Sequence, residues 1–257
     1  MDKPNVRLDK FHRGVFSVYQ LTARGHQSGS DALLLAASLP EGANGHLADL
    51  GSGAGVAGLA ALSMNQGLQA TLVEIDPGMA DLARRTLEAP QNLAIGERAR
   101  VLVADVTLSG EKREKAGLLN AHYDHVIMNP PYNHEAQRPS PDELRSLAHS
   151  MGEGGLDPWM RTAAAILKPG GMLHLVWRTE RLADVLAASH GRFGGTTVLP
   201  LHSREGAAAS RIIVRSVKGS RAPFSIAQGV VLHTEDGKAT PLADAALNGL
   251  ARLPFPD

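Results

Sequence analysis

Cysteine is absent from this chain, and no apolar run reaches the roughly 18 residues that a membrane-spanning helix needs. Without cysteine the protein can form no disulfide, no thiolate metal site and no cysteine nucleophile. The first residues carry charges with no apolar segment behind them, so we expect no secretory signal. These absences favour a cytoplasmic protein that does not enter the membrane.

A net charge is also missing, because 26 Lys and Arg balance 26 Asp and Glu, which argues weakly against a nucleic-acid binder. The distribution is uneven: residues 159–221 hold ten basic and three acidic residues, a net charge of +7. Such a segment is either a surface that faces phosphate groups or a set of solvated side chains, and the sequence leaves both open. Its basic residues include Arg178, Arg181, Arg192, Arg204, Arg211, Arg215, Lys218 and Arg221.

Short apolar stretches alternate with helical patterns, which predicts a mostly parallel sheet with helices on both faces. The expected strands are residues 15–21, 46–50, 70–75, 100–104, 122–128, 172–176, 196–199, 210–217 and 230–233. The expected helices are residues 31–38, 55–65, 77–88, 141–151, 157–167 and 180–190. The last two strands are expected to form a hairpin, and residues 168–171 a turn. Residues 133–157 are expected to be an insertion near the active face, and no structure is predicted for residues 106–121.

A glycine-rich turn, Gly51-Ser52-Gly53-Ala54-Gly55, follows the expected strand at residues 46–50. Glycine allows positive φ angles and a close approach of the backbone to a ligand. With Gly58 the turn also matches the dinucleotide-binding pattern, which is a weak signal when it stands alone. Glu74 ends the next strand, where a carboxylate can accept hydrogen bonds from both hydroxyls of a ribose.

Two carboxylates favour a methyl donor over a dinucleotide. Asp49 precedes the first glycine, where it can meet the cationic methionine end of S-adenosylmethionine. Asp105 ends the strand at residues 100–104, where it can accept from an adenine amino group. Either residue alone could be a turn-former or a helix cap, but together with the glycine turn they predict a site for S-adenosylmethionine.

The tetrapeptide Asn129-Pro130-Pro131-Tyr132 follows the expected strand at residues 122–128. The Asn129 side-chain oxygen and the Pro130 carbonyl can accept both hydrogens of a planar NH2 group and direct its lone pair toward a methyl donor. Two prolines fix φ near −65° and hold that carbonyl in place. Tyr132 can stack on a planar substrate. The tetrapeptide therefore predicts transfer of a methyl group to nitrogen, with no metal and no covalent enzyme intermediate.

With these motifs the chain resembles class I methyltransferases that methylate amino groups, and more narrowly the bacterial tRNA adenine-N6 methyltransferases that modify the adenosine beside the anticodon of a valine tRNA. A further motif, Gly29-Ser30-Asp31, is similar to that family's upstream Gly-Thr-Asp. The resemblance implies a Rossmann-like α/β fold with a mostly parallel seven-stranded sheet and an antiparallel C-terminal hairpin. It implies one domain over residues 1–257, with an N-terminal extension at 1–40 and a catalytic core at 41–257.

The resemblance also implies roles for particular residues. The acceptor residues would be Asn129, Pro130, Pro131 and Tyr132. The donor-binding residues would be Ser30, Asp31, Asp49, Gly51, Ser52, Gly53, Gly55, Glu74, Ile75, Asp105 and Val106. The partner would be tRNA, bound around residues 178–221 and the 133–157 loop.

Three alternatives stay open. The same tetrapeptide serves glutamine methylation of peptide-chain release factors, although those enzymes usually carry a helical domain before the donor strand. An amine of ribosomal RNA or of a small molecule is another possible acceptor. A module that binds the cofactor or RNA without catalysis needs neither Asn129 nor the donor carboxylates.

Overall fold

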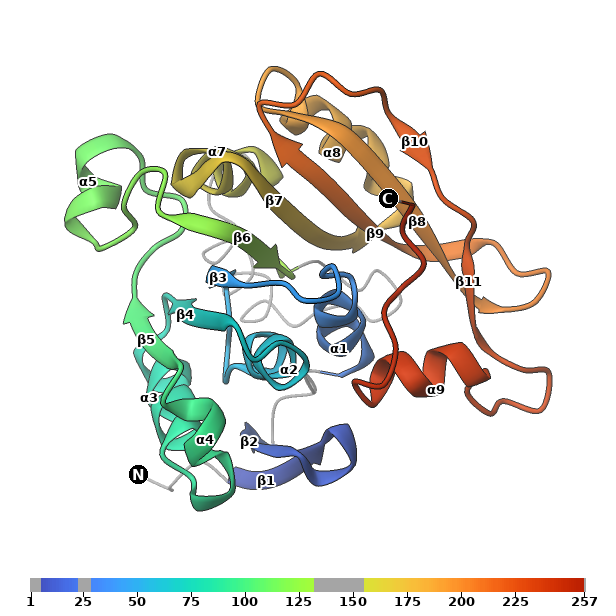
Figure 1. Cartoon of the computed structure of the whole chain (residues 1–257), viewed down its shortest axis with the longest axis horizontal. Coiled ribbons are helices and arrows are strands. Elements are labelled where there is room, and N and C mark those ends of the chain that lie inside the picture. The colour runs from blue at the N-terminus through green and yellow to red at the C-terminus, as the bar shows by residue number, and fades with distance from the viewer. Residues whose placement is uncertain (1–5, 23–28, 132–154, 257) are drawn as a thin grey trace, which may run out of the picture.

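The computed structural model describes residues 6–22, 29–131 and 155–256. Within these ranges the chain forms one nine-stranded sheet with helices on both faces and a separate two-stranded hairpin (Figure 1). The strands of the sheet are β3 (Gly45–Leu50), β4 (Leu68–Glu74), β5 (Ala99–Val103), β6 (Tyr123–Met128), β7 (Leu167–Arg178), β8 (Phe193–Arg204), β9 (Ala209–Lys218), β10 (Ser225–Ile226) and β11 (Val230–His233). The hairpin consists of β1 (Val6–Phe11) and β2 (Phe16–Leu21).

The order of the strands reverses near the middle of the sheet. The sheet runs β10-β8-β9-β7-β6-β3-β4-β5, and β11 extends the same outer edge by pairing with β8. Its strand pairs are parallel except where β9 runs antiparallel to β7 and β8. Strand order reverses at β3, which has β4 on one side and β6 on the other. Ligands of open α/β sheets bind at the carboxyl ends of the strands at such a reversal.

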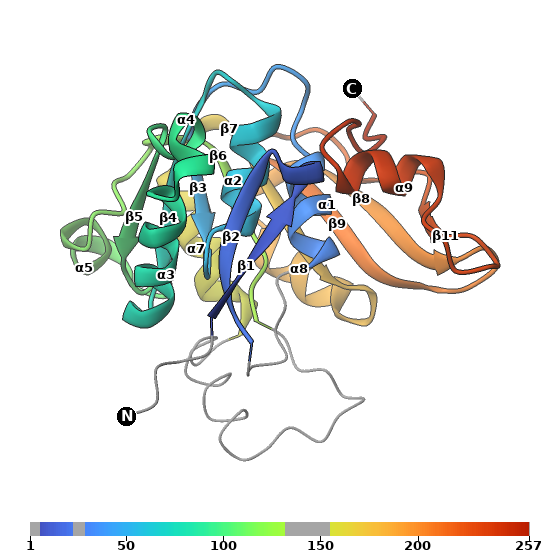
Figure 2. The same cartoon turned by 90° about the horizontal axis from the view of Figure 1, so that it is seen from below.

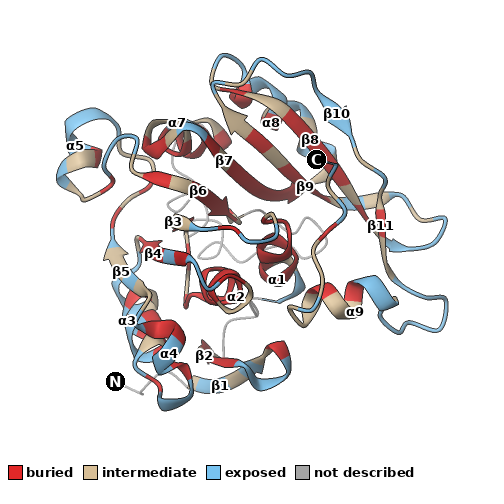
Figure 3. Ribbon diagram, in the orientation of Figure 1, coloured by how far each residue is buried: buried red, intermediate tan, exposed pale blue. Residues whose placement is uncertain are grey.

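Helices cover both faces of the sheet. One face carries α1 (Ser30–Ala37), α2 (Val56–Met64), α3 (Pro77–Leu87), α4 (Leu93–Gly96) and α9 (Pro241–Leu247), which share one apolar cluster. The opposite face carries α7 (Leu156–Ile166) and α8 (Leu182–Ser189) over a second cluster, and α5 (Gly110–Lys115) lies near the β5 end of the sheet. The central strands are buried on both sides, as their apolar sequences require (Figure 3).

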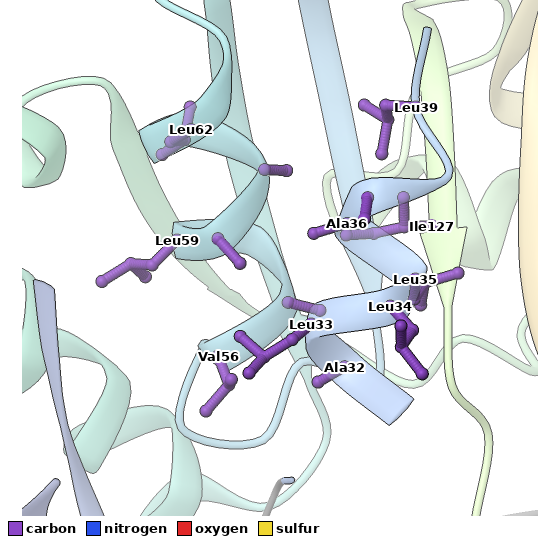
Figure 4. Packing of buried hydrophobic residues seen from close by; sticks show 14 of the residues in the cluster. Ala32, Leu33, Leu34, Leu35, Ala36, Leu39, Val56, Leu59, Leu62 and Ile127 are labelled. Atoms are coloured by element: carbon purple, nitrogen blue, oxygen red, sulfur yellow. The ribbon is translucent and has the colours of Figure 1, made fainter. Parts of the chain in front are cut away.

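Helices α1 and α2 pack side by side on the sheet (Figure 4). Leu33 of α1 lies next to α2, and Ile127 of β6 lies beneath α1. All residues of α2 from Val56 to Leu62 are buried. A helix that is apolar all round lies in the core, which places α2 firmly behind the glycine turn that precedes it.

Two buried polar side chains attach the β1–β2 hairpin to the helical layer, which it crosses (Figure 2). Asn92 accepts the Ser17 backbone N–H at 2.9 Å and donates to the Ser17 carbonyl at 2.6 Å. Thr86 Oγ1 accepts the Tyr19 N–H at 3.1 Å. These side chains take the place of a neighbouring strand, so the exposed edge of β2 is satisfied without joining the main sheet.

The expected fold class is confirmed, but several details differ. The sheet has nine strands instead of seven, and the strand expected at residues 15–21 pairs with the unpredicted β1 outside it. The predicted short strand at 196–199 is the twelve-residue β8. The prediction was too short because β8 contains Gly194, Gly195 and Pro200, and such residues normally end strands. A bulge between Gly194 and Thr197 accommodates the glycines.

The predicted hairpin of residues 210–217 and 230–233 is wrong. β9 pairs with β7 and β8, whereas β11 runs parallel to β8 on its outer edge. Residues 168–171 lie inside β7 as an irregularity in its pairing with β6, where Gly170 has a φ of 77°. The unassigned stretch 106–121 contains α5. The helix expected at residues 141–151 lies outside the described residues.

Among the described residues no helix combines the length and apolar character needed to cross a membrane.

Candidate functional site

Most of the predicted site residues lie along one edge of the sheet. Leu50 at the end of β3 is paired with Val73 of β4 and with Met128 of β6. The glycine turn, Glu74 and Asn129 therefore leave the sheet side by side, and Asp105 follows β5 next to them. Strand pairing thus brings together residues that are as many as 80 positions apart in the chain.

The glycine turn has the backbone that its sequence predicts. Gly51, Gly53 and Gly55 have φ angles of 71°, 54° and 97°. The N–H groups of Gly51 and Ser52 donate to the Val73 carbonyl at 2.9 and 3.0 Å. Ser52 is buried, and its Oγ has no hydrogen-bond partner in the protein. A buried hydroxyl without a partner, in a loop of positive φ angles, fits a polar ligand at this turn.

Asp49 lies buried beneath the turn. Its Oδ2 accepts the Gly58 N–H in the first turn of α2 at 2.9 Å. Burial raises the pKa of Asp49 to about 7, the bond from Gly58 opposes this, and the nearby Glu74 adds to it. A Cβ at Gly58 would lie 2.3 Å from the Leu72 side chain, so this glycine serves the packing of α2 on β4. Asp49 therefore has a structural role as well as its predicted place near a ligand.

Both carboxylate oxygens of Glu74 accept hydrogen bonds from backbone N–H groups. Oε2 accepts the Gly53 N–H at 2.8 Å, and Oε1 accepts the Asp76 N–H at 2.8 Å. Asp76 in turn caps α3 by accepting from the Met79 N–H at 2.9 Å. Each carboxylate oxygen has a second lone pair for a ligand hydroxyl. Ile75, between the two acids, is partly exposed at the same edge.

Asp105 forms a tight local turn after β5. Its Oδ1 accepts from both the backbone N–H and the Oγ1 hydroxyl of Thr107, each at 2.7 Å. Val106 is buried against the second apolar cluster. Thr162 of α7 donates to the Leu108 carbonyl at 3.2 Å, which anchors the turn to the helix behind it.

Trp159 of α7 contacts the glycine turn, a contact that was not predicted from the sequence. A Cβ at Gly51 would lie 2.7 Å from Cη2 of this indole. Trp159 is 3% exposed, and its Nε1 has no partner. In the sequence it is one apolar residue of an amphipathic helix, and only the tertiary packing reveals the contact.

Asn129 follows β6 with its side-chain oxygen buried and without a hydrogen-bond partner among the described residues. Pro130 is buried behind it, and Pro131 is partly exposed. Tyr132 lies outside the described residues. An unpartnered buried acceptor is costly unless something binds to it, so Asn129 is the strongest structural sign of an acceptor site.

The upstream motif lies at the start of α1. Ser30 is exposed, and Asp31 forms an ion pair with Arg211 of β9 at 3.3 Å. Asp31 is thus held against β9.

The basic segment does not form one surface. Arg178, Arg211 and Arg215 lie on the face of the sheet that α1 covers, because they follow the register of Val176 and Ile213. Arg192 pairs instead with Asp157 of α7 at 2.6 Å on the other side. The predicted RNA surface over residues 178–221 is therefore divided between two faces. The part nearest Asn129 is the end of β7.

Comparison with known proteins supports this architecture. Residues 10–199 match the family described as methyltransferase small domain. A predicted O-methyltransferase from Agrobacterium tumefaciens has a similar crystal structure, with a TM-score of 0.76 and 39% identity over 87% of this chain and 98% of that one. TYW2 from M. jannaschii, solved with AdoMet, is 12% identical with a TM-score of 0.56 over 84% of this chain and 87% of that one, which shows the fold alone.

Curated relatives fall into two groups. A tRNA1(Val) (adenine(37)-N6)-methyltransferase from Tolumonas auensis is 30% identical over 160 residues, 62% of this chain and 62% of the relative. A release factor glutamine methyltransferase from Bifidobacterium longum is 32% identical over 154 residues, 55% of this chain and 51% of the relative. The matches thus cover between half and two thirds of each relative's length.

Proposed function

Because the chain belongs to the methyltransferase small domain family, we propose that it is an S-adenosylmethionine-dependent N-methyltransferase that modifies the exocyclic N6 amine of an adenosine in tRNA. The observation that carries the proposal is the buried, unpartnered Oδ1 of Asn129 beside the glycine turn. An NH2 group brings the hydrogens that this oxygen lacks. The Pro130 carbonyl would accept the second hydrogen.

The glycine turn and the carboxylates beside it would hold the donor, and S-adenosylmethionine supplies the electrophilic methyl group. Glu74 would accept the ribose hydroxyls with its remaining lone pairs. Asp105 would face the adenine amino group, with Ile75 and Val106 beside the ring. The buried carboxyl of Asp49 and the free hydroxyl of Ser52 would face the methionine end. Ser30 and Asp31 would close the pocket from α1.

Methylation of nitrogen fits the acceptor residue better than methylation of oxygen, although the Agrobacterium relative is described as a predicted O-methyltransferase. A hydroxyl must lose its proton to become nucleophilic, which calls for a base. The amide oxygen of Asn129 can orient N–H groups but cannot remove a proton near neutral pH. Its contribution is therefore positioning and electrostatic stabilisation of the transition state.

The tRNA acceptor is supported by the Tolumonas relative and by related enzymes from Porphyromonas and Bacteroides that share its description. The Bifidobacterium relative favours a second candidate, a glutamine side-chain amide of a release factor, which presents the same planar NH2 group. The hairpin shares the apolar cluster of α1 and α2, which supports one methyltransferase domain across the chain. A tRNA substrate would place that domain in the cytoplasm.

The test is methyl transfer from labelled S-adenosylmethionine to unmodified tRNA and, in parallel, to purified release factor. We expect label in tRNA, recovered as N6-methyladenosine. In Asn129→Ala the rate should fall by roughly 10²–10³-fold, while the affinity for S-adenosylhomocysteine stays the same. Label found only in the release factor would show that the acceptor is a protein amide and not an adenosine. Wild-type activity in the variant would contradict the role of Asn129.

A further inference from the structure

Two arginines lie side by side on neighbouring strands beyond the acceptor residue, and one of them is paired with a carboxylate. Arg178 ends β7 and is directly opposite Arg211 in the register with β9. Arg178 forms an ion pair with Glu180, in the short turn that follows β7. The pKa of Glu180 lies below its ordinary value because of its own backbone N–H and the charges of Arg178 and Arg211. Glu180 is therefore the ion-pair partner of Arg178, and Arg211 lies directly across the strand pair from Arg178.

The location of this pair matters for the acceptor. Leu175 of β7 is paired with Met128 of β6. Arg178 lies three residues past that level, and Asn129 lies one residue past it. Extended-strand spacing puts the two Cα atoms roughly 8 Å apart. Arg178 thus lies close to the proposed position of the base, with Arg211 one strand further out.

The carboxylate that is paired with Arg178 is easily displaced. The Arg178 side chain is 20% exposed, whereas that of Glu180 is 51% exposed. An ion pair with an exposed partner contributes little to stability. A phosphate offers more acceptor oxygens than a carboxylate and matches the planar donors of arginine. Asp31 holds Arg211 from the other side at 3.3 Å, which orients it.

We propose that Arg178 and Arg211 bind a backbone phosphate of the RNA beside the target adenosine, and that Glu180 occupies this site in the ligand-free protein. The proposal rests on the proposed function and specifies how the substrate is held. It assigns only the phosphate-binding role to the arginines, and the chemistry stays with Asn129. It predicts that substitution of Arg178 weakens RNA binding and substitution of Glu180 strengthens it. A salt bridge with a purely structural role would not give opposite effects on RNA binding.

The experiment measures binding of an unmodified anticodon stem-loop RNA at several salt concentrations, with S-adenosylhomocysteine binding as the check on folding. Arg178→Gln should weaken RNA binding by about tenfold and reduce the salt slope by about 1. Glu180→Gln should tighten it by several-fold. In the double variant the gain from Glu180→Gln should vanish, because Arg178, the ion-pair partner of Glu180, is gone. Affinity for S-adenosylhomocysteine should stay unchanged throughout.

A matched control separates a specific site from general charge. Asp184→Asn removes the same charge nearby, but Asp184 pairs with Arg181. An equal gain in RNA affinity from Glu180→Gln and Asp184→Asn would overturn the proposal, and so would wild-type RNA affinity in Arg178→Gln. If the wild-type protein does not bind the RNA but methylates a release factor, the proposed function fails and the phosphate site fails with it. Tight wild-type binding that none of these changes affects overturns the phosphate site alone.

Discussion

The proposed donor and acceptor sides of the sheet edge satisfy their polar groups in different ways. On the proposed donor side, Asp49, Glu74 and Asp105 each accept backbone N–H groups at 2.7–2.9 Å. On the acceptor side, the buried oxygen of Asn129 has no partner among the described residues.

We therefore infer that the proposed donor site is formed before its ligand binds, whereas the proposed acceptor site is completed by hydrogen bonds from its substrate. The donor carboxylates hold loops in shape before any ligand arrives, which limits the ordering that binding requires. Asn129 keeps an unpaired acceptor, so the protein bears a cost that only a hydrogen-bond donor can remove. The following predictions alter one side at a time.

The largest expected effect comes from Gly51→Ala on the donor side. An alanine at this position would have to adopt a φ of 71°, and its Cβ would lie 2.7 Å from the Trp159 ring. Positive φ costs an alanine about 1–2 kcal/mol, and the overlap adds roughly 1–3 kcal/mol. We expect the free energy of unfolding in urea to fall by their sum, with at least a tenfold loss of S-adenosylhomocysteine affinity.

Gly53→Ala is the control for this prediction. Its φ is 54°, but the nearest heavy atom to a Cβ there is Met79 Cε at 3.7 Å. It should show the conformational cost alone, about 1–2 kcal/mol. Equal destabilisation by the two substitutions would mean that the contact with Trp159 does not constrain the turn.

The sequence pointed to residues on both the proposed donor side and the proposed acceptor side, for physical reasons. The glycine turn, Glu74 and Asp105 lie at the ends of short apolar strands, and parallel pairing then brings these ends together. Asn129 was found because its proline neighbours form a recognisable tetrapeptide. Local patterns were enough wherever one segment carries both the strand and the functional group.

The remaining features depend on pairing between distant segments. Trp159 reaches Gly51 through the packing of α7, and nothing in its own helix indicates that contact. Arg178 meets Arg211 only through the register of β7 and β9. The same limit explains the wrong hairpin, because adjacency in the chain suggested that β9 pairs with β11, whereas β11 pairs with β8.

A moderate effect is expected from the buried carboxyl of Asp49. Burial raises its pKa from 3.8 to about 7. Between these two values the folded protein keeps a proton that the unfolded chain has released. Its contribution to stability is therefore fully present below pH 3.8 and is lost as the pH rises through about 7.

Asp49→Asn removes this titration while keeping an oxygen for the Gly58 N–H. Urea unfolding of both proteins from about pH 5 to pH 8 gives a difference in which the other titrating groups cancel. The wild-type protein should lose stability relative to the variant as the pH rises. A difference that does not change with pH would show that the carboxyl titrates alike in the folded and unfolded states.

The smallest expected effect is on the stability of Asn129→Ala, and it separates the two sides most directly. Removing an acceptor that has no partner relieves the cost of burying it, which offsets the packing that is lost. We expect the free energy of unfolding to change by less than about 1 kcal/mol, although the rate of methyl transfer should fall by roughly 10²–10³-fold. Asn92→Ala is the matched control, because Asn92 is fully buried with one bond accepted and two donated. It should destabilise the protein by about 2–4 kcal/mol. Equal losses would mean that Asn129 is already satisfied within the protein, so that the acceptor side is as complete as the donor side before substrate binds.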